Sequence, residues 1–146
     1  MNLTKTILII SQKSGVGKTT IADEILFELE RHSFPYTFYE LDDQGGKVHK
    51  PVKKPEARFI VADTPGGLCA DTPKWIYTSD LVILPTRPSF WDIEPFLRMG
   101  ALIRKNLKPG AGAMFVINMV NPRFKATRDF MEWLKTAIRK TGAVWQ

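Results

Sequence analysis

The 146-residue sequence has little cysteine, little histidine and no long apolar run, and each of these shortages excludes a class of protein or of site. A single cysteine, Cys69, excludes an intrachain disulfide and suits a reducing cytosol, so we expect a cytoplasmic protein. The apolar runs are far shorter than the roughly 20 residues that span a bilayer, and the N-terminus has no secretory pattern. No second His, Cys or carboxylate stands at metal-ligand spacing from His49, which we interpret as a solvated side chain.

Composition and length are typical of one soluble domain, expected to cover residues 1–146. The 44% hydrophobic and 25% charged content is ordinary for a globular chain with a buried core. Charge is uneven, because residues 1–97 carry 11 Lys and Arg against 13 Asp and Glu, whereas residues 98–146 carry 10 against 2. The basic C-terminal half favours an acidic partner, nucleic acid first, with a solvated basic surface as the alternative.

Residues 11–20 read S-Q-K-S-G-V-G-K-T-T and follow the apolar segment Thr6–Ile10. This pattern indicates a strand, a glycine-bearing loop and a helix, in which backbone N–H groups and the helix N-terminus converge on an anion. Lysine in such a loop reaches the terminal phosphates, and the hydroxyl after it ligates Mg²⁺. The predicted nucleotide-binding residues of the loop are Lys13, Ser14, Gly15, Val16, Gly17, Lys18, Thr19 and Thr20.

Apolar segments alternate with helical patterns along the whole chain, which predicts an α/β fold: a three-layer α/β/α P-loop NTPase fold with a mainly parallel sheet. The predicted strands are Leu3–Ile10, Tyr36–Leu41, Arg58–Ala62, Leu81–Leu84, Ala113–Asn118 and a last one at Ala143–Trp145. The predicted helices are Lys18–His32, Pro73–Thr78, Ile93–Asn106 and Thr127–Thr141. Ligands of such folds lie at the carboxyl ends of the strands.

Two predicted strands end in aspartate. E-L-D-D-Q-G-G places Asp42 at the carboxyl edge of the sheet, and R-F-I-V-A-D-T-P-G-G places Asp63 there as well. Two such carboxylates on neighbouring strands could divide their work between the metal and the attacking water. Gly66 and Gly67 would let a backbone N–H face the γ-phosphate and sense its presence.

These motifs resemble those of the ParA/MinD family of deviant Walker-type ATPases, which position DNA or other cargo in bacterial cells. The resemblance rests on Q-K-S-G-V-G-K-T-T, on E-L-D-D-Q-G-G, on V-A-D-T-P-G-G and, more weakly, on I-L-P-T-R-P-S-F-W-D-I-E-P. It implies an ATP-dependent homodimer that hydrolyses ATP slowly with Mg²⁺, acts in plasmid or chromosome partition or related cargo positioning, and responds to an activating or adaptor protein.

The resemblance also implies roles for individual residues. Lys18 and Thr19 would hold phosphate and Mg²⁺, Asp63 would complete the metal site, and Asp42 would position or polarise the attacking water. The catalytic residues are thus predicted to be Lys13, Lys18 and Asp42, and the metal-binding residues Thr19 and Asp63.

Two further roles follow from the resemblance. Lys13 would be the signature lysine, which crosses to the nucleotide of the partner subunit. Asn118, at the end of a strand, matches the residue that often reads the adenine edge, and capping of a turn is its alternative.

The chain departs from the family pattern at three places. Ser14 replaces a glycine, the stretch between Asp43 and the third strand is short, and the chain stops soon after Trp145, where members such as MinD carry a membrane-binding helix. We therefore expect no membrane anchor, in a member that is either minimal or truncated.

The predicted C-terminal helix has an apolar stripe and a basic face. Its stripe consists of Phe130, Leu134, Ala137 and Ile138. The basic side chains left for solvent or DNA phosphate are Arg123, Lys125, Arg128, Lys135, Arg139 and Lys140.

Two other function classes remain. A small-molecule kinase or related phosphotransferase would need a substrate pocket and an arginine-rich lid, for which the short connectors leave little room. A GTPase would fit D-T-P-G as a D-x-x-G switch, but the N-K-x-D pattern that reads guanine is absent from residues 117–121. ATP is therefore preferred over GTP.

Overall fold

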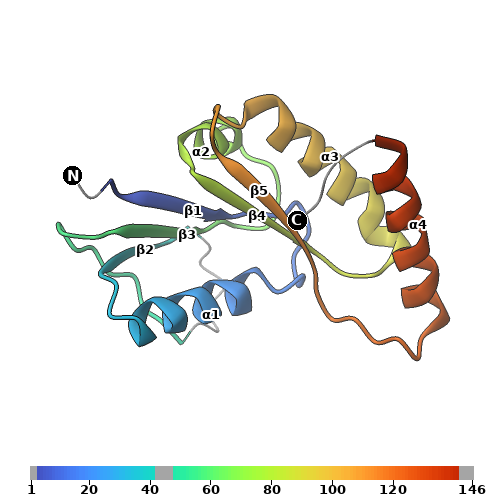
Figure 1. Cartoon of the computed structure of the whole chain (residues 1–146), viewed down its shortest axis with the longest axis horizontal. Coiled ribbons are helices and arrows are strands. Elements are labelled where there is room, and N and C mark those ends of the chain that lie inside the picture. Colours follow the sequence, from blue (N-terminus) through green and yellow to red (C-terminus); the bar gives the residue numbers. More distant parts are fainter. Residues whose placement is uncertain (1–2, 42–47, 142–146) are drawn as a thin grey trace.

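A computed structural model describes residues 3–41 and 48–141, in which five strands alternate with four helices (Figure 1). The first half contains β1 (Lys5–Ile9), α1 (Lys18–Arg31), β2 (Tyr36–Glu40), β3 (Phe59–Asp63) and α2 (Thr72–Thr78). The second half contains β4 (Leu81–Thr86), α3 (Phe90–Asn106), β5 (Gly112–Ile117) and α4 (Lys125–Thr141). The predicted strand Ala143–Trp145 lies outside the described residues.

The five strands form one parallel sheet in the order β2-β3-β1-β4-β5. The strand that precedes the glycine loop therefore lies in the middle, between β3 and β4. In the register of β1 and β3, Ile9 pairs with Asp63, so both strands end at the same level. The predicted α/β fold with a parallel sheet is confirmed, and it brings the glycine loop beside the end of β3.

Helices cover both faces of the sheet (Figure 1). On one face, Ala22, Leu26 and Leu29 of α1 pack in a cluster with buried residues of β1 to β4. On the other face, α2 and α3 bury Ile76 and Met99 against β1, β3 and β4. Such burial on both sides is why the strands carry continuous apolar runs rather than an alternating pattern.

The last helix lies beside α3, on the side of the sheet away from α1 (Figure 1). Phe130 of α4 is fully buried, and Leu134 packs against the cluster formed with α2 and α3. These two members of the predicted apolar stripe therefore do face the core. No helix of the described ranges is both long and apolar enough to cross a membrane.

The third helix begins at Phe90 rather than at Ile93, where the sequence predicted its start. Ser89 is the N-cap residue, and the Asp92 N–H donates to the Ser89 carbonyl. Pro95 lies inside the helix and removes only one backbone hydrogen bond there. The proline therefore does not mark the beginning of the helix.

The basic connector between β2 and β3 runs along the outer edge of the sheet. Phe38 and Val52 form an antiparallel bridge with hydrogen bonds of 2.8 and 3.2 Å. The Lys54 N–H donates to the Thr37 hydroxyl over 3.1 Å. These contacts occupy backbone groups that an edge strand otherwise leaves open to other chains.

Candidate functional site

The glycine loop turns between the central strand and α1 with two residues in the left-handed region. Gly15 has φ 71° and Gly17 has φ 95°, conformations that strain any residue with a side chain. Val16 between them is buried, and Lys18, the first residue of α1, is only 6% exposed. The loop thus presents backbone N–H groups and one buried lysine at the positive end of a helix, a setting that attracts phosphate.

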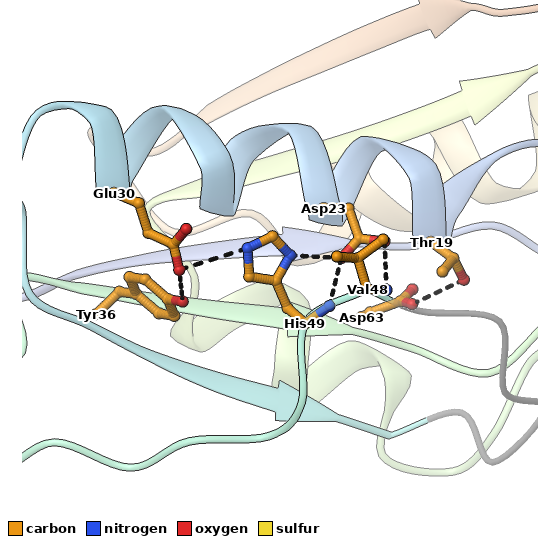
Figure 2. A network of polar contacts seen from close by, with 7 residues as sticks. All are labelled: Thr19, Asp23, Glu30, Tyr36, Val48, His49 and Asp63. Atoms are coloured by element: carbon orange, nitrogen blue, oxygen red, sulfur yellow. Dashed lines mark hydrogen bonds and ion pairs between the residues drawn. The ribbon is translucent and has the colours of Figure 1, made fainter.

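A hydroxyl and a carboxylate meet directly below this loop. The Thr19 hydroxyl donates to Asp63 Oδ2 over 3.2 Å, and Asp63 is fully buried at the end of β3 (Figure 2). This donor set fits Mg²⁺, which takes one or two protein oxygens and fills its other positions with water and substrate phosphate. No cluster of three or more His, Cys, Asp or Glu side chains within residues 3–41 and 48–141 could hold a metal by itself.

The serine that departs from the family pattern fits its position because a glycine faces it. Ser14 does not have a positive φ, so its backbone has no need of glycine. A Cβ on Gly66 would lie 2.6 Å from Ser14 Oγ. The Gly67 N–H donates to the Ser11 carbonyl over 3.3 Å, so of the two predicted phosphate-sensing glycines this one is already engaged.

Asn118 follows β5 and braces the glycine loop. Its Nδ2 donates to the Val16 carbonyl over 3.1 Å, and its Oδ1 accepts the Met119 N–H over 2.9 Å. The amide lies so close to the loop that a Cβ on Gly17 would stand 2.1 Å from Nδ2. The predicted adenine-reading residue therefore holds the phosphate loop in place, with one hydrogen and one lone pair of its amide left for a ligand.

An open groove of about 430 Å³ leads from Asn118 along α1. Its apolar lining comes from Ile21, Ile25 and Leu29, and Glu24 and Glu28 lie on its polar side. An apolar groove with a few polar groups beside a phosphate loop has room for a nucleoside.

The first turn of α3, which follows β4 at the carboxyl edge of the sheet, carries two exposed aromatic side chains. Arg87 Nε and Nη2 donate to the two oxygens of Asp92 over 2.7 and 3.1 Å, and the Asp92 carboxylate raises the pKa of Arg87. Asp92 is buried, whereas Phe90 and Trp91 are 54% and 85% exposed. The ion pair fixes the turn, so these exposed rings stand on a rigid support.

Lys13 lies half-buried in the loop, next to Ser14. Within the part of the chain that the structure describes, no ion pair joins its ammonium group to a carboxylate. Of the three residues with an implied catalytic role, Lys13, Lys18 and Asp42, the last lies outside the described residues.

The prediction that His49 is solvated is wrong, because its side chain is only 8% exposed. The ring packs edge-on against Phe27 at 4.5 Å. Its Nδ1 lies 2.6 Å from Asp23 Oδ1 (Figure 2). Its Nε2 lies 3.5 Å from Glu30 Oε1, which also accepts the Tyr36 hydroxyl over 2.6 Å. His49 thus connects α1 and β2 through a chain of polar contacts, which its own sequence neighbourhood did not reveal.

The Asp23 carboxylate also accepts the backbone N–H groups of Val48 and His49, over 3.1 and 3.0 Å. Burial by itself would raise the pKa of Asp23, but these bonds and the His49 ring outweigh it and hold the pKa below its usual value. The Tyr36 hydroxyl likewise lowers the pKa of Glu30. Sequence analysis missed Asp23, and the only signal was its helical spacing from Thr19.

Basic side chains of α4 and of the turn before it face outward. Lys125 pairs with Asp129 over 3.0 Å, and Lys135 pairs with Glu132 over 3.4 Å. The described members of the predicted basic set are all exposed: Arg123, Lys125, Arg128, Lys135 and Arg139.

Comparison with known proteins agrees with this geometry. Residues 7–144 match the family model described as the CobQ/CobB/MinD/ParA nucleotide binding domain, CbiA. No curated protein sequence matches the chain at a significant level. The solved structures described next are 17 to 19% identical to this chain, so their likeness to it is a likeness of fold.

Three solved structures illustrate that fold. A plasmid partition protein from Borrelia burgdorferi has a TM-score of 0.71 at 19% identity, over 92% of this chain and 86% of that one. Cobyrinic acid a,c-diamide synthase from Mycobacterium smegmatis, with bound ADP and magnesium, has a TM-score of 0.69 at 17% identity, over 94% and 82%. The septum site-determining protein MinD from Pyrococcus horikoshii, complexed with Mg-ADP, has a TM-score of 0.64 at 18% identity, over 88% and 77%.

Proposed function

Because the chain belongs to the CobQ/CobB/MinD/ParA nucleotide-binding domain family, we propose that it binds ATP with Mg²⁺ and hydrolyses it slowly as a dimerisation switch. Such a switch would serve plasmid or chromosome partition or a related positioning task. The observation that carries the proposal is the Thr19–Asp63 contact of 3.2 Å beneath a glycine loop whose two left-handed residues are glycines.

In this proposal the residues of the loop bind and orient the triphosphate. Backbone N–H groups of residues 13–19 and the Lys18 ammonium would neutralise phosphate charge. Thr19 and Asp63 would hold Mg²⁺, which would supply further positive charge to the phosphate group. Asp42 orients the attacking water, as the family resemblance implies. Asn118 keeps the loop in its binding conformation through the Val16 carbonyl.

The groove beside Asn118 supports binding of an adenine nucleotide. Ile21 and Ile25 offer apolar contact to a base, and the remaining amide hydrogen and lone pair of Asn118 are available to pair with a base edge. Because the guanine-reading N-K-x-D sequence is absent, ATP is expected to compete successfully with GTP for this site.

Dimerisation is supported by the surface around the loop. Lys13 carries a charge that no described carboxylate pairs with, and Phe90 and Trp91 stand exposed at the start of α3, the helix that follows the neighbouring strand β4. We propose that ATP brings two such surfaces together and that Lys13 contacts the partner's phosphates. A cytoplasmic location and an adaptor that accelerates turnover belong to the same proposal.

Size-exclusion chromatography with ADP or with a non-hydrolysable ATP analogue tests the switch. Wild-type protein is expected to dimerise only with the ATP analogue, and Lys13→Ala to retain nucleotide binding but stay monomeric. Lys50→Ala removes an exposed lysine of the connector and serves as the charge-matched control. A Lys13→Ala protein that dimerises like the control would refute the role of Lys13, and ATP turnover without any dimer would favour a phosphotransferase.

Turnover of the Asp42→Ala protein tests the assignment of the catalytic aspartate. If Asp42 orients the attacking water, this variant binds ATP and accumulates in the ATP-bound dimer. Undiminished phosphate release would assign that task to a different residue.

Nonspecific DNA binding is proposed for the basic surface around α4. Arg123 and Arg139 are exposed and basic without a described acidic partner, so they are the strongest candidates for phosphate contacts. The double variant Arg123→Ala/Arg139→Ala should weaken DNA binding and reduce its salt dependence, because each phosphate contact releases counterions. Arg31→Ala, at the end of α1, is the control, and a mobility shift that is insensitive to salt or to ATP contradicts the proposal.

A further inference from the structure

One face of α1 connects the metal-side hydroxyl to the buried histidine. Thr19, Asp23, Phe27 and Glu30 follow one another at helical spacing, so their side chains lie on a single stripe of the helix. Thr19 contacts Asp63 at one end of the stripe, and Asp23 and Glu30 contact the His49 ring farther along it (Figure 2). Phe27 packs against the same ring. The helix that follows the glycine loop therefore also provides the side chains that bind the connector between β2 and β3.

Asp23 holds the connector at Val48 and His49. Three donors converge on its carboxylate: the backbone N–H groups of Val48 and His49 and the ring of His49. An ionised carboxylate with several donors makes the stronger kind of hydrogen bond, and it is costly to remove from a buried site. The attachment lies one helical turn after Thr19, on the side of α1 that faces Asp63.

The remaining contacts of His49 act at a distance from the loop. Glu30 is about half exposed, and its 3.5 Å contact with Nε2 is longer than the 2.6 Å contact of Asp23 with Nδ1. Beyond α1, Tyr36 of β2 donates to Glu30, and Lys54 lies over the Tyr36 ring at 5.4 Å. These contacts can be removed without touching the bonds of Asp23.

We infer that Asp23 and His49 are positioning residues for ATP hydrolysis, because their contacts fix the backbone of the connector at Val48 and His49 against α1, one turn from Thr19. The inference rests on the proposed function. The Asp23 carboxylate is occupied by the three donors of the connector, so its loss is expected to leave ATP affinity intact and to lower the rate of the chemical step. A shift of about 1 Å in catalytic geometry lowers rates by as much as about 100-fold.

Two matched substitutions of His49 separate its two contacts. An asparagine amide nitrogen stands about where the histidine Nδ1 does, so His49→Asn keeps a donor for Asp23. A glutamine amide nitrogen stands about where Nε2 does, so His49→Gln keeps a donor for Glu30 and loses the one for Asp23. Tyr36→Phe removes the hydroxyl bond to Glu30 and leaves Asp23 untouched, which makes it the control for general loosening of the network.

The test measures phosphate release, affinity for a fluorescent ATP analogue, and amide hydrogen exchange of Val48 and His49. Asp23→Ala and His49→Gln are expected to lower kcat about 10- to 100-fold at unchanged nucleotide affinity, with faster exchange of both amides. His49→Asn and Tyr36→Phe are expected to stay near wild type in all three measurements. Thermal unfolding confirms that each variant is folded.

The possible outcomes separate the two proposals. Wild-type protein that binds no ATP or releases no phosphate would refute the proposed function, and this inference with it. If the wild type turns over but Asp23→Ala is equally active, or if His49→Gln and His49→Asn behave alike, only the positioning role is refuted. A parallel loss of nucleotide affinity and rate would also overturn it, because it would show a role in the loop itself.

Discussion

Gly17→Ala should destabilise the protein through two separable effects. The first is backbone strain, since Gly17 has φ 95° and a left-handed residue with a side chain costs about 1–2 kcal/mol. The second is displacement of Asn118, whose Nδ2 lies 2.1 Å from the position of the new methyl group. Moving that amide breaks its bonds to Val16 and Met119, each worth about 0.5–1.5 kcal/mol. The expected loss is therefore about 2–5 kcal/mol.

Urea unfolding of a double-mutant cycle with Asn118→Ala measures the two effects separately. In that background the amide and its bonds are already absent, so Gly17→Ala should cost only the backbone strain of about 1–2 kcal/mol. Gly15→Ala is the control, because Gly15 also has a positive φ but no atom lies within 4 Å of the place that its new methyl group would take. Its cost should not depend on residue 118.

Equal costs of Gly17→Ala in the two backgrounds, within about 0.5 kcal/mol, would refute the bracing role of Asn118. Coupling of Gly15→Ala to Asn118→Ala would refute it as well, since it would show a general softening of the loop. Affinity for a fluorescent ATP analogue should follow the same pattern, because the braced loop is the proposed phosphate site.

Three other predictions concern the packing and charges that support the site. Burial and the bond to Glu30 raise the pKa of Tyr36 from 10.0 to about 12, so stability from this hydroxyl is complete below pH 10 and is lost as the pH rises through about 12. Tyrosinate absorbance should show a step near pH 12 that Tyr36→Phe lacks, and a wild-type curve without it contradicts the burial. The Thr6 N–H holds the pKa of Asp80 below 3.8, so Asp80→Asn should lower the free energy of unfolding by about 1.5 kcal/mol at pH 7. This deficit should shrink as the pH falls below about 4, and a deficit that stays constant with pH would be evidence against the role of the Asp80 charge. Phe130→Ala, at a fully buried residue of α4, should cost about 3–5 kcal/mol in urea unfolding, whereas a loss below about 1 kcal/mol would mean that α4 does not pack on the core.

The meeting of the loop and the metal-side aspartate was predictable because it depends on local sequence and on the geometry of parallel strands. Lys18 and Thr19 follow their glycines in a strand-loop-helix pattern, and Asp63 ends a strand that is apolar on both faces. Parallel strands present their carboxyl ends at one edge, so these side chains had to lie near each other. The 3.2 Å contact between Thr19 and Asp63 follows from the adjacency of β1 and β3.

Long-range partners could not be predicted in the same way. His49 looked solvated because no second His, Cys or carboxylate stands at metal-ligand spacing from it in the sequence. In the structure, the carboxylates of Asp23 and Glu30 on α1 contact its ring. Asn118 looked like a base reader or a turn cap, and its donor bond crosses 102 positions to Val16. Burial and hydrogen bonding of such polar residues depend on which elements pack together.

The sequence by itself determined the class of fold and the strand-loop-helix setting of the glycine loop, because periodicity and glycine placement act over a few residues. The tertiary structure decided what supports that loop. It placed the Asn118 amide on the loop backbone, gave Ser14 room opposite Gly66, and buried His49 between α1 and the connector. Each of these contacts joins segments far apart in the chain, and only the packing of the sheet and its helices sets their distance and exposure to water.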